Sequence, residues 1–82
     1  MIEEKNSLHN YLDLRGIACP TNYIRSCLAI EDLNDQETII IDLDKGEPYL
    51  MVQNGLSECG HKIKIISDNE QWVRLSVLCC VK

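Results

Sequence analysis

The chain closes with a run in which apolar and polar residues alternate. Between Trp72 and Val81, every second residue would share one face of a β-strand: Val73, Leu75, Val77, Cys79 and Val81. A shorter alternating run, Lys62 to Ile66, comes before it, and the polar segment 67–71 between them suits a tight turn. The pattern predicts an antiparallel β-hairpin.

Two strands and two helices are expected before this hairpin. The strands are His9 to Leu14 and Thr38 to Leu43, and the three consecutive isoleucines of the second suit a central, covered position. Helical spacing predicts one helix from about Pro20 to Leu33, with an inner face of Ile24, Cys27, Leu28 and Leu33. A second helix starts at 46–48, with an inner stripe of Tyr49, Val52, Leu56 and Cys59. Gly60 suits its C-terminal cap, whereas Gly55 costs about 1 kcal/mol within it and predicts a short or broken helix.

The order β-α-β-α-β-β predicts an α/β (α+β) fold. Right-handed crossovers place both helices on one face of a four-stranded mixed sheet, as a two-layer sandwich. The other face has no helices and would carry Thr38, Ile40, Asp42, Trp72, Arg74, Ser76, Leu78 and Cys80. Its apolar members are candidates for a partner surface, although half-exposed apolar residues are common on small sheets.

Length and composition limit the classes of protein that fit. With 82 residues, of which 45% are hydrophobic, we expect a flexible tail at 1–8 and a single domain at 9–82. No apolar run is long enough to cross a membrane, and the N-terminus does not resemble a signal peptide. We therefore expect a cytoplasmic protein without a membrane association, and a monomer in the first instance.

The formal net charge of −5 is unevenly distributed. Seven acidic residues and a single lysine lie between Glu31 and Glu47. Because an acidic chain is repelled by phosphate, this charge disfavours direct nucleic-acid binding and is easier to match with a basic protein partner. The alternative is that these acids only solvate loops and helix ends.

Cys19 is the strongest candidate for chemistry. Pro20 is suited to the first position of a helix, which would put Cys19 at the N-cap beside free backbone N–H groups and the positive end of the helix dipole. A thiol there ionises more easily and can act as a nucleophile. Gly16 would allow the tight turn before it, and Arg15 would add positive potential or hold a partner's carboxylate, unless it is a solvated charge. The alternative for Cys19 is a buried structural thiol.

The other four cysteines are assigned to packing. The odd total of five and the lack of an export signal favour reduced thiols over a disulfide framework. Cys27 lies about 12 Å of helical rise beyond Cys19, too far for a disulfide. Cys59 fits helix packing, and Cys79 and Cys80 would point to opposite faces, one buried and one exposed.

Neither a metal nor another cofactor is expected. Cys59, His61, Cys79 and Cys80 match no common zinc spacing. His9 and His61 fit surface histidines better than catalytic bases, and no Cys-His or Ser-His-Asp arrangement stands out.

The string Asp13-Leu14-Arg15-Gly16-Ile17-Ala18-Cys19-Pro20 resembles the TusA-type, or SirA-like, family of sulfur carriers. The resemblance extends from about Tyr11 to Val81 and implies the two-layer α/β fold. It also implies that Cys19 carries a persulfide, received from a donor protein such as a cysteine desulfurase or rhodanese. The sulfur would pass to an acceptor protein in tRNA thiolation, cofactor biosynthesis or sulfur metabolism. Such a protein is a sulfurtransferase-type carrier and not a stand-alone turnover enzyme.

One position departs from the family pattern. The best-known carriers have Cys-Pro-x-Pro, whereas this chain has Asn22 at the fourth position. Carriers with asparagine there resemble a distinct subgroup, often with Gly-Glu-Pro before the second helix, as at 46–48. Because Asn22 lies in the first helical turn, we expect Asn22→Pro to be tolerated.

Two alternatives to a sulfur carrier stay open. The first is a non-catalytic interaction or regulatory module that uses the same fold to bind protein. The second is a selenium or redox carrier that uses the same thiolate, although a redox carrier needs a second thiol near Cys19 and the local sequence has none.

Overall fold

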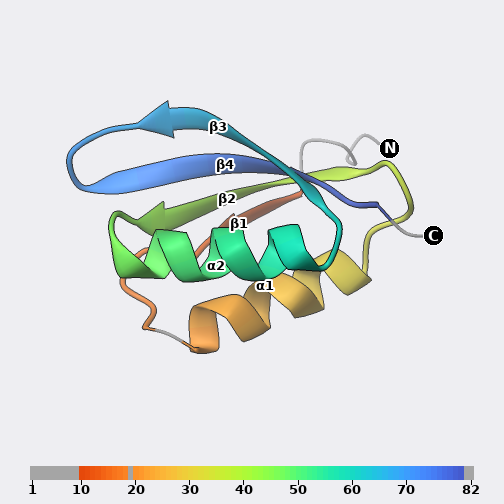
Figure 1. The fold of residues 1–82 in the computed structure, drawn as a ribbon, viewed down its shortest axis with the longest axis horizontal. Helices are drawn as coiled ribbons and strands as arrows, with labels where there is room; N and C mark the ends of the chain where they lie inside the picture. The colour runs from red at the N-terminus through yellow and green to blue at the C-terminus, as the bar shows by residue number, and fades with distance from the viewer. Residues whose placement is uncertain (1–9, 19, 81–82) are drawn as a thin grey trace, which may run out of the picture.

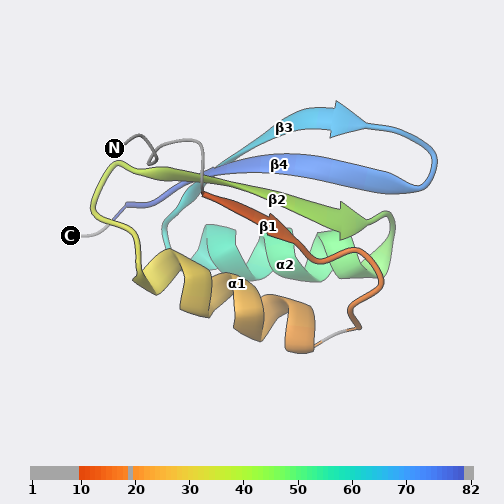
Figure 2. The ribbon, with the colours of Figure 1, turned by 180° about the vertical axis from the view of Figure 1, so that it is seen from behind.

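The computed structural model describes residues 10–18 and 20–80, so the predicted tail at 1–8, His9, Cys19 and Val81 lie outside the described residues. The elements are β1 (Tyr11–Asp13), α1 (Thr21–Glu31), β2 (Thr38–Asp44), α2 (Glu47–Glu58), β3 (Lys62–Asp68) and β4 (Trp72–Leu78). The sheet order is β1-β2-β4-β3, with β1 parallel to β2 and the other neighbours antiparallel. Both helices cover the same face (Figures 1 and 2), so the predicted fold class is confirmed.

The core lies between the two helices and the central strands β2 and β4. Their inward side chains are almost fully buried, and α2 covers them with Val52 and Leu56. The strand residues are Ile39, Ile41, Leu43, Val73, Leu75 and Val77. The alternation predicted for 72–81 is confirmed up to Leu78, where β4 ends, and the β3–β4 hairpin is confirmed by its antiparallel register.

The inner face predicted for the first helix was wrong at Ile24 and Leu28, whereas Cys27 and Leu33 are partly buried against the core as predicted. Ile24 and Leu28 are 52% and 58% exposed, and the buried row of α1 is Asn22, Ser26 and Ile30. The oxygens of the two buried polar side chains bond to nearby backbone groups. The Ser26 hydroxyl donates to the carbonyl of Asn22, and the Asn22 side-chain oxygen accepts from the N–H of Tyr23.

The second helix is continuous through Gly55, contrary to the expectation of a break. A Cβ at Gly55 would overlap the Cε1 atom of Tyr23 and approach its Cδ1 atom to 2.9 Å. The glycine therefore costs helix propensity but lets the Tyr23 ring of α1 lie directly on the backbone of α2. Cys59, which we had placed on the inner stripe, is the exposed C-cap of α2. Gly60 follows it with a φ of +97°, the left-handed conformation expected there.

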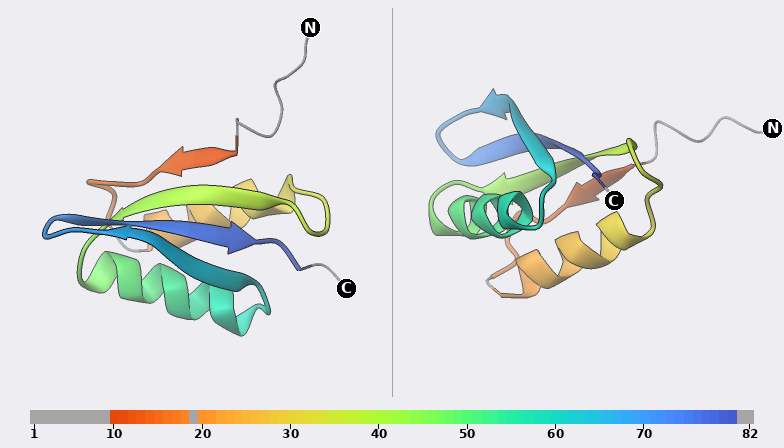
Figure 3. Two further views of the ribbon diagram at one scale, coloured as in Figure 1. Left: turned by 90° about the horizontal axis from the view of Figure 1, so that it is seen from above. Right: turned by 45° about the vertical axis from the view of Figure 1, so that its right-hand side comes forward.

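The two helices run in the same direction (Figures 1 and 3). Each follows one of the two parallel strands β1 and β2 and returns along the same face of the sheet. One helical turn therefore moves along the helix pair in the same direction on α1 and on α2. No helix in the described part of the chain is long and apolar enough to span a bilayer.

The helix-free face of the sheet carries a buried carboxylate. Asp42 on β2 is fully buried and accepts two hydrogen bonds from Arg74 on β4, at 2.8 and 3.0 Å, and one from the hydroxyl of Tyr11 on β1, at 2.6 Å. Burial raises the pKa of Asp42, but these donors outweigh it and the pKa lies below its ordinary value. The Arg74 guanidinium also lies 5.1 Å from the ring centre of Trp72, the residue we had placed on this face.

The two edges of the sheet are short or interrupted. Edge strand β1 has three residues. Edge strand β3 exposes Lys62 and Lys64, and its pairing with β4 shifts register between Ile65 and Ser67. Both features limit the regular backbone that a further strand could pair with.

We expect Gly55→Ala to lower the free energy of unfolding by about 1–2 kcal/mol, although alanine is the better helix former, because the new methyl group displaces the Tyr23 ring. Urea unfolding followed by circular dichroism measures the change. Asn54→Ala, at the exposed neighbouring position, is the matched control and should be neutral or slightly stabilising. A stabilised Gly55→Ala protein would show that the ring moves aside at little cost. In a Tyr23→Leu background, the penalty should largely disappear.

We expect Asp42→Asn to cost about 2 kcal/mol at neutral pH, because it removes the charged acceptor of three hydrogen bonds. A carboxylate with a lowered pKa stabilises the fold above its unfolded value of about 3.9 and loses this contribution as the pH falls through the folded value. The wild-type stability should therefore fall on acidification below about pH 4, and the Asp42→Asn variant should show a flatter acid limb. Asp32→Asn, at an exposed helix end, should keep the wild-type profile.

Candidate functional site

The segment that carries the family motif is the turn between β1 and α1. Leu14 follows β1 and is fully buried, and its N–H donates to the carbonyl of Asp42 at 2.8 Å. The carbonyl of Leu14 then accepts from the N–H of Ile17 at 3.1 Å, which closes a tight turn. The turn is thus anchored by backbone bonds to the central sheet.

Gly16 occupies a position that requires glycine. Its φ of +82° lies in the left-handed region, as the predicted tight turn demands. Its N–H donates to a carboxylate oxygen of Asp44, at the end of β2, at 2.9 Å. This bond is a second link between the turn and β2.

Arg15 is held against the helix-free face of the sheet. Its Nε and Nη2 atoms bond both carboxylate oxygens of Asp13, at 2.9 and 3.0 Å, and its guanidinium lies 5.2 Å from the ring centre of Trp72. The side-chain hydrogen bond from Arg15 lowers the pKa of Asp13 to about 2. The positive charge predicted for this position is therefore already paired, and the contacts of Arg15 stabilise the turn.

Helical structure begins immediately after the motif. The predicted catalytic residue Cys19 lies outside the described residues, between the exposed Ala18 and Pro20. Pro20 is the N-cap of α1. The sequence had predicted Cys19 as the N-cap and Pro20 as the first helical residue, so the helix starts one residue later than predicted. Helix boundaries commonly differ by one residue. The carbonyl of Ala18 accepts from the N–H of Asn22 at 3.1 Å.

Asn22 is fully buried in the first turn of α1. Its side-chain oxygen accepts from the N–H of Tyr23 at 2.6 Å, whereas its Nδ2 has no hydrogen-bond partner among the residues that the structure describes. A buried amide nitrogen without an acceptor costs free energy. Sequence reasoning singled out Asn22 only through its departure from the family pattern.

An apolar groove of about 320 Å³ starts at Pro20 and runs between the two helices. Its walls are Pro20 and Tyr23 from α1 and four residues of α2: Met51, Asn54, Gly55 and Glu58. Ile24, the next residue of α1 beyond Tyr23, is exposed beside it. The surface next to the motif is thus hollow and largely apolar.

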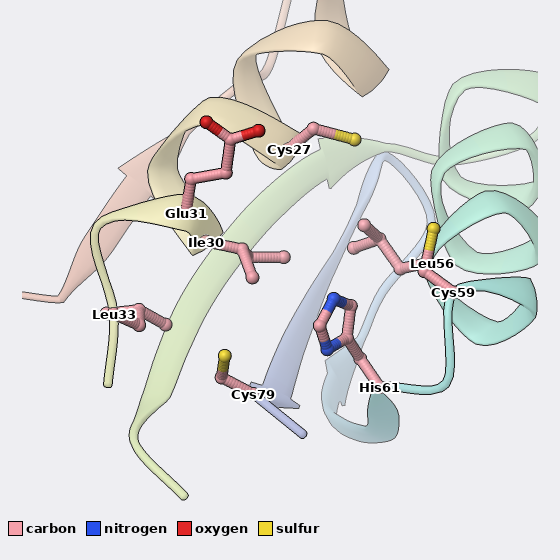
Figure 4. Close-up of a pocket in the computed structure, with 8 residues that line it drawn as sticks. All are labelled: Cys27, Ile30, Glu31, Leu33, Leu56, Cys59, His61 and Cys79. Carbon is pink, nitrogen blue, oxygen red and sulfur yellow. The ribbon is translucent and has the colours of Figure 1, made fainter. Parts of the chain in front are cut away.

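A second cavity of about 360 Å³ lies at the other end of the helix pair (Figure 4). It is lined by three thiols, those of Cys27, Cys59 and Cys79, and by His61. Cys79 is buried, and burial raises the pKa of its thiol, whereas Cys80 is half-buried, in line with the alternation expected for the pair. His61 accepts through Nδ1 from the N–H of Cys80 at 3.1 Å.

These cysteines do not assemble a metal centre. Within residues 10–18 and 20–80, no three His, Cys, Asp or Glu side chains converge as metal ligands, so the zinc set considered from the sequence is not brought together. The sequence analysis did not predict that Cys27 and Cys59 line the same cavity, or that the Tyr23 hydroxyl lies 3.7 Å from the sulfur of Cys59. The only sequence signal for this contact was the unexplained Gly55.

Comparison with known proteins identifies the family. Residues 10–78 match the family described as Sulfurtransferase TusA. The chain belongs to the TusA family. The crystal structure of a SirA-like protein from Desulfitobacterium hafniense superposes with a TM-score of 0.73 and 15% sequence identity, over 87% of this chain and 97% of that chain. At this identity the superposition supports the fold alone. A comparison with curated proteins gave no match.

The environment of Asn22 changes our expectation for Asn22→Pro. Proline removes the N–H that bonds to Ala18, and it also removes a fully buried side chain. We now expect the variant to lose about 1–3 kcal/mol of unfolding free energy, measured by urea denaturation. Thr21→Ala, at the exposed neighbouring position, is the control and should change little. A fully stable Asn22→Pro protein would show that the Ala18 bond carries little weight.

Proposed function

We propose that this protein is a small sulfur carrier that holds a persulfide on Cys19 and passes it between partner proteins. The observation that carries the proposal is the TusA match over residues 10–78, which contains the Gly16-to-Pro20 motif. The anchoring of the motif turn supports it, because a transfer site needs a fixed approach geometry. The proposal needs no resident cofactor.

The chemistry is two exchange steps without net oxidation. The Cys19 thiolate attacks the terminal sulfur of a persulfide on the donor protein. The donor sulfur–sulfur bond breaks, the donor leaves as a thiolate, and a new sulfur–sulfur bond forms on Cys19. A thiolate on the acceptor protein then attacks the terminal sulfur of the Cys19 persulfide and releases the Cys19 thiolate.

The neighbouring residues would assist in different ways. Gly16 and the Asp44 carboxylate hold the turn. Pro20 begins the helix, whose free N–H groups favour an anion near its start. The unpartnered Nδ2 of Asn22, three residues after Cys19 in the chain, is a donor for the sulfur. Arg15 acts mainly by holding the turn, because Asp13 and Trp72 already engage its guanidinium.

Partner proteins would contact the surface beside Pro20. The groove between α1 and α2 starts there, and the exposed Ile24 and Leu28 extend the apolar surface along α1. A cysteine desulfurase or a rhodanese is the proposed class of donor. The acceptor would act in tRNA thiolation, cofactor biosynthesis or sulfur metabolism. We propose that the carrier works as a cytoplasmic monomer and binds no nucleic acid directly, in keeping with its net charge of −5.

We expect wild-type protein to gain one sulfur atom after incubation with a cysteine desulfurase and cysteine, and Cys19→Ser to gain none while folding normally. Intact mass spectrometry measures the loading, and circular dichroism measures the fold. Cys59→Ser, which removes a different exposed thiol, is the matched control and should load like the wild type.

Three other results would count against the proposal. Equal loading of Cys19→Ser would place the sulfur on another thiol, such as Cys80. A Cys19→Ser protein that does not fold would show a structural thiol. A wild-type protein that takes up no sulfur from the desulfurase, from thiosulfate or from a rhodanese would favour the interaction module.

A further inference from the structure

The second group of thiols lies where the two helices meet. Tyr23 and Gly55 touch, as the overlap of a Gly55 Cβ with the Tyr23 ring shows. Cys27 follows Tyr23 by four residues, and Cys59 follows Gly55 by four residues. Because the helices run in the same direction, one turn from this contact brings Cys27 of α1 and Cys59 of α2 to the same level.

Three observations confirm that the two sulfurs share one environment. The Tyr23 hydroxyl lies 3.7 Å from the sulfur of Cys59. The Cys27 thiol, and after it the Cys59 thiol, are the largest causes that raise the pKa of Tyr23. Both thiols also line the cavity of Figure 4, into which their side chains project from facing helices.

The two thiols differ in exposure to solvent, and this difference determines which of them reacts first. Cys59 is exposed at the C-cap of α2, whereas Cys27 is half-buried. An external reagent therefore meets Cys59 first. Gly55 has no side chain, so one turn away from the two thiols the Tyr23 ring of α1 packs directly on the backbone of α2.

We propose that Cys27 and Cys59 are a redox-active dithiol that a small disulfide of the glutathione class oxidises to a bond linking α1 to α2. The Cys59 thiolate attacks one sulfur of oxidised glutathione, breaks its sulfur–sulfur bond and releases one glutathione thiolate. The Cys27 thiolate then attacks the Cys59 sulfur of the mixed disulfide and releases the second glutathione. The protein loses two electrons and two protons, and glutathione disulfide gains them as two thiols.

This site is separate from sulfur transfer at Cys19 and does not depend on it. The bond would tie the helix that follows Pro20 to the end of α2. Reversible disulfides of this kind in reducing compartments commonly serve as sensors. The pair would make the distance between α1 and α2 depend on the ratio of thiols to disulfides in the surrounding solution.

The test uses the full chain with Cys19→Ser, so that the proposed carrier thiol cannot take part. The result for the Cys27–Cys59 bond is then independent of whether Cys19 carries sulfur. Reduced protein is incubated with excess oxidised glutathione, free thiols are alkylated, and intact mass and non-reducing peptide mapping follow. We expect a protein lighter by two hydrogen atoms, without bound glutathione and with the Cys27 and Cys59 peptides joined. Its thermal midpoint should rise by several degrees, and dithiothreitol should reverse both changes.

Variants then assign the bond. Cys27→Ser in the same background should stop at a stable glutathione adduct on Cys59. Cys80→Ser, the matched control, should form the bond unchanged. Peptide mapping of the parent protein decides the pairing even if Cys27→Ser does not fold. A bond that joins other cysteines, a persistent adduct on Cys59 despite an intact Cys27, or an unreacted protein would overturn the proposal.

Discussion

Two helices must cover one whole face of a four-stranded sheet, and this requires that they lie in direct contact. Gly55 makes the contact possible, because it lets the Tyr23 ring rest on the backbone of α2. With the helices side by side, Val52 and Leu56 of α2 and Ile30 of α1 cover the apolar side of β2 and β4. A wider spacing would leave a gap over the core, and gaps of this kind are costly in proteins.

Because both helices cover one face of the sheet, the other face has no helix and is held by contacts between polar side chains. Asp42 is buried there without a helix above it, because Tyr11 and Arg74 from the neighbouring strands enclose its carboxylate. Arg15 joins this layer through Trp72, the ring that Arg74 also approaches. The turn that leads to Cys19 is therefore connected to the centre of the sheet from two sides, by backbone bonds to β2 and by side chains on the open face.

The sequence predicted the strands well because their signal is local. Alternation over 72–78 and the isoleucines of β2 specify burial directly, and Gly60 marked the end of α2 by its backbone requirement. The inner face of α1 could not be predicted from hydropathy. Ile24 and Leu28 are apolar but exposed, whereas Asn22 and Ser26 are buried, and the Ser26 hydroxyl and the Asn22 side-chain oxygen bond to local backbone groups.

The candidate site was predictable in part for the same reason. The position of Gly16 in the turn follows from its backbone preference, whereas Pro20 is the N-cap and not, as predicted, the first helical residue. Arg15 pairs locally with Asp13, two residues earlier, whereas its contact with Trp72 depends on how β1 and β4 are placed in the sheet. The meeting of Cys27 and Cys59 depends on the relative direction of two helices, which no local pattern encodes.

The short and interrupted sheet edges bear on aggregation. Exposed strand edges favour aggregation and fibre growth in concentrated protein solutions. The three-residue β1 offers little template, and the lysines and register shift of β3 oppose the addition of a further strand. Edge protection of this kind favours solubility in crowded solution without any loss of the helical surface beside Pro20.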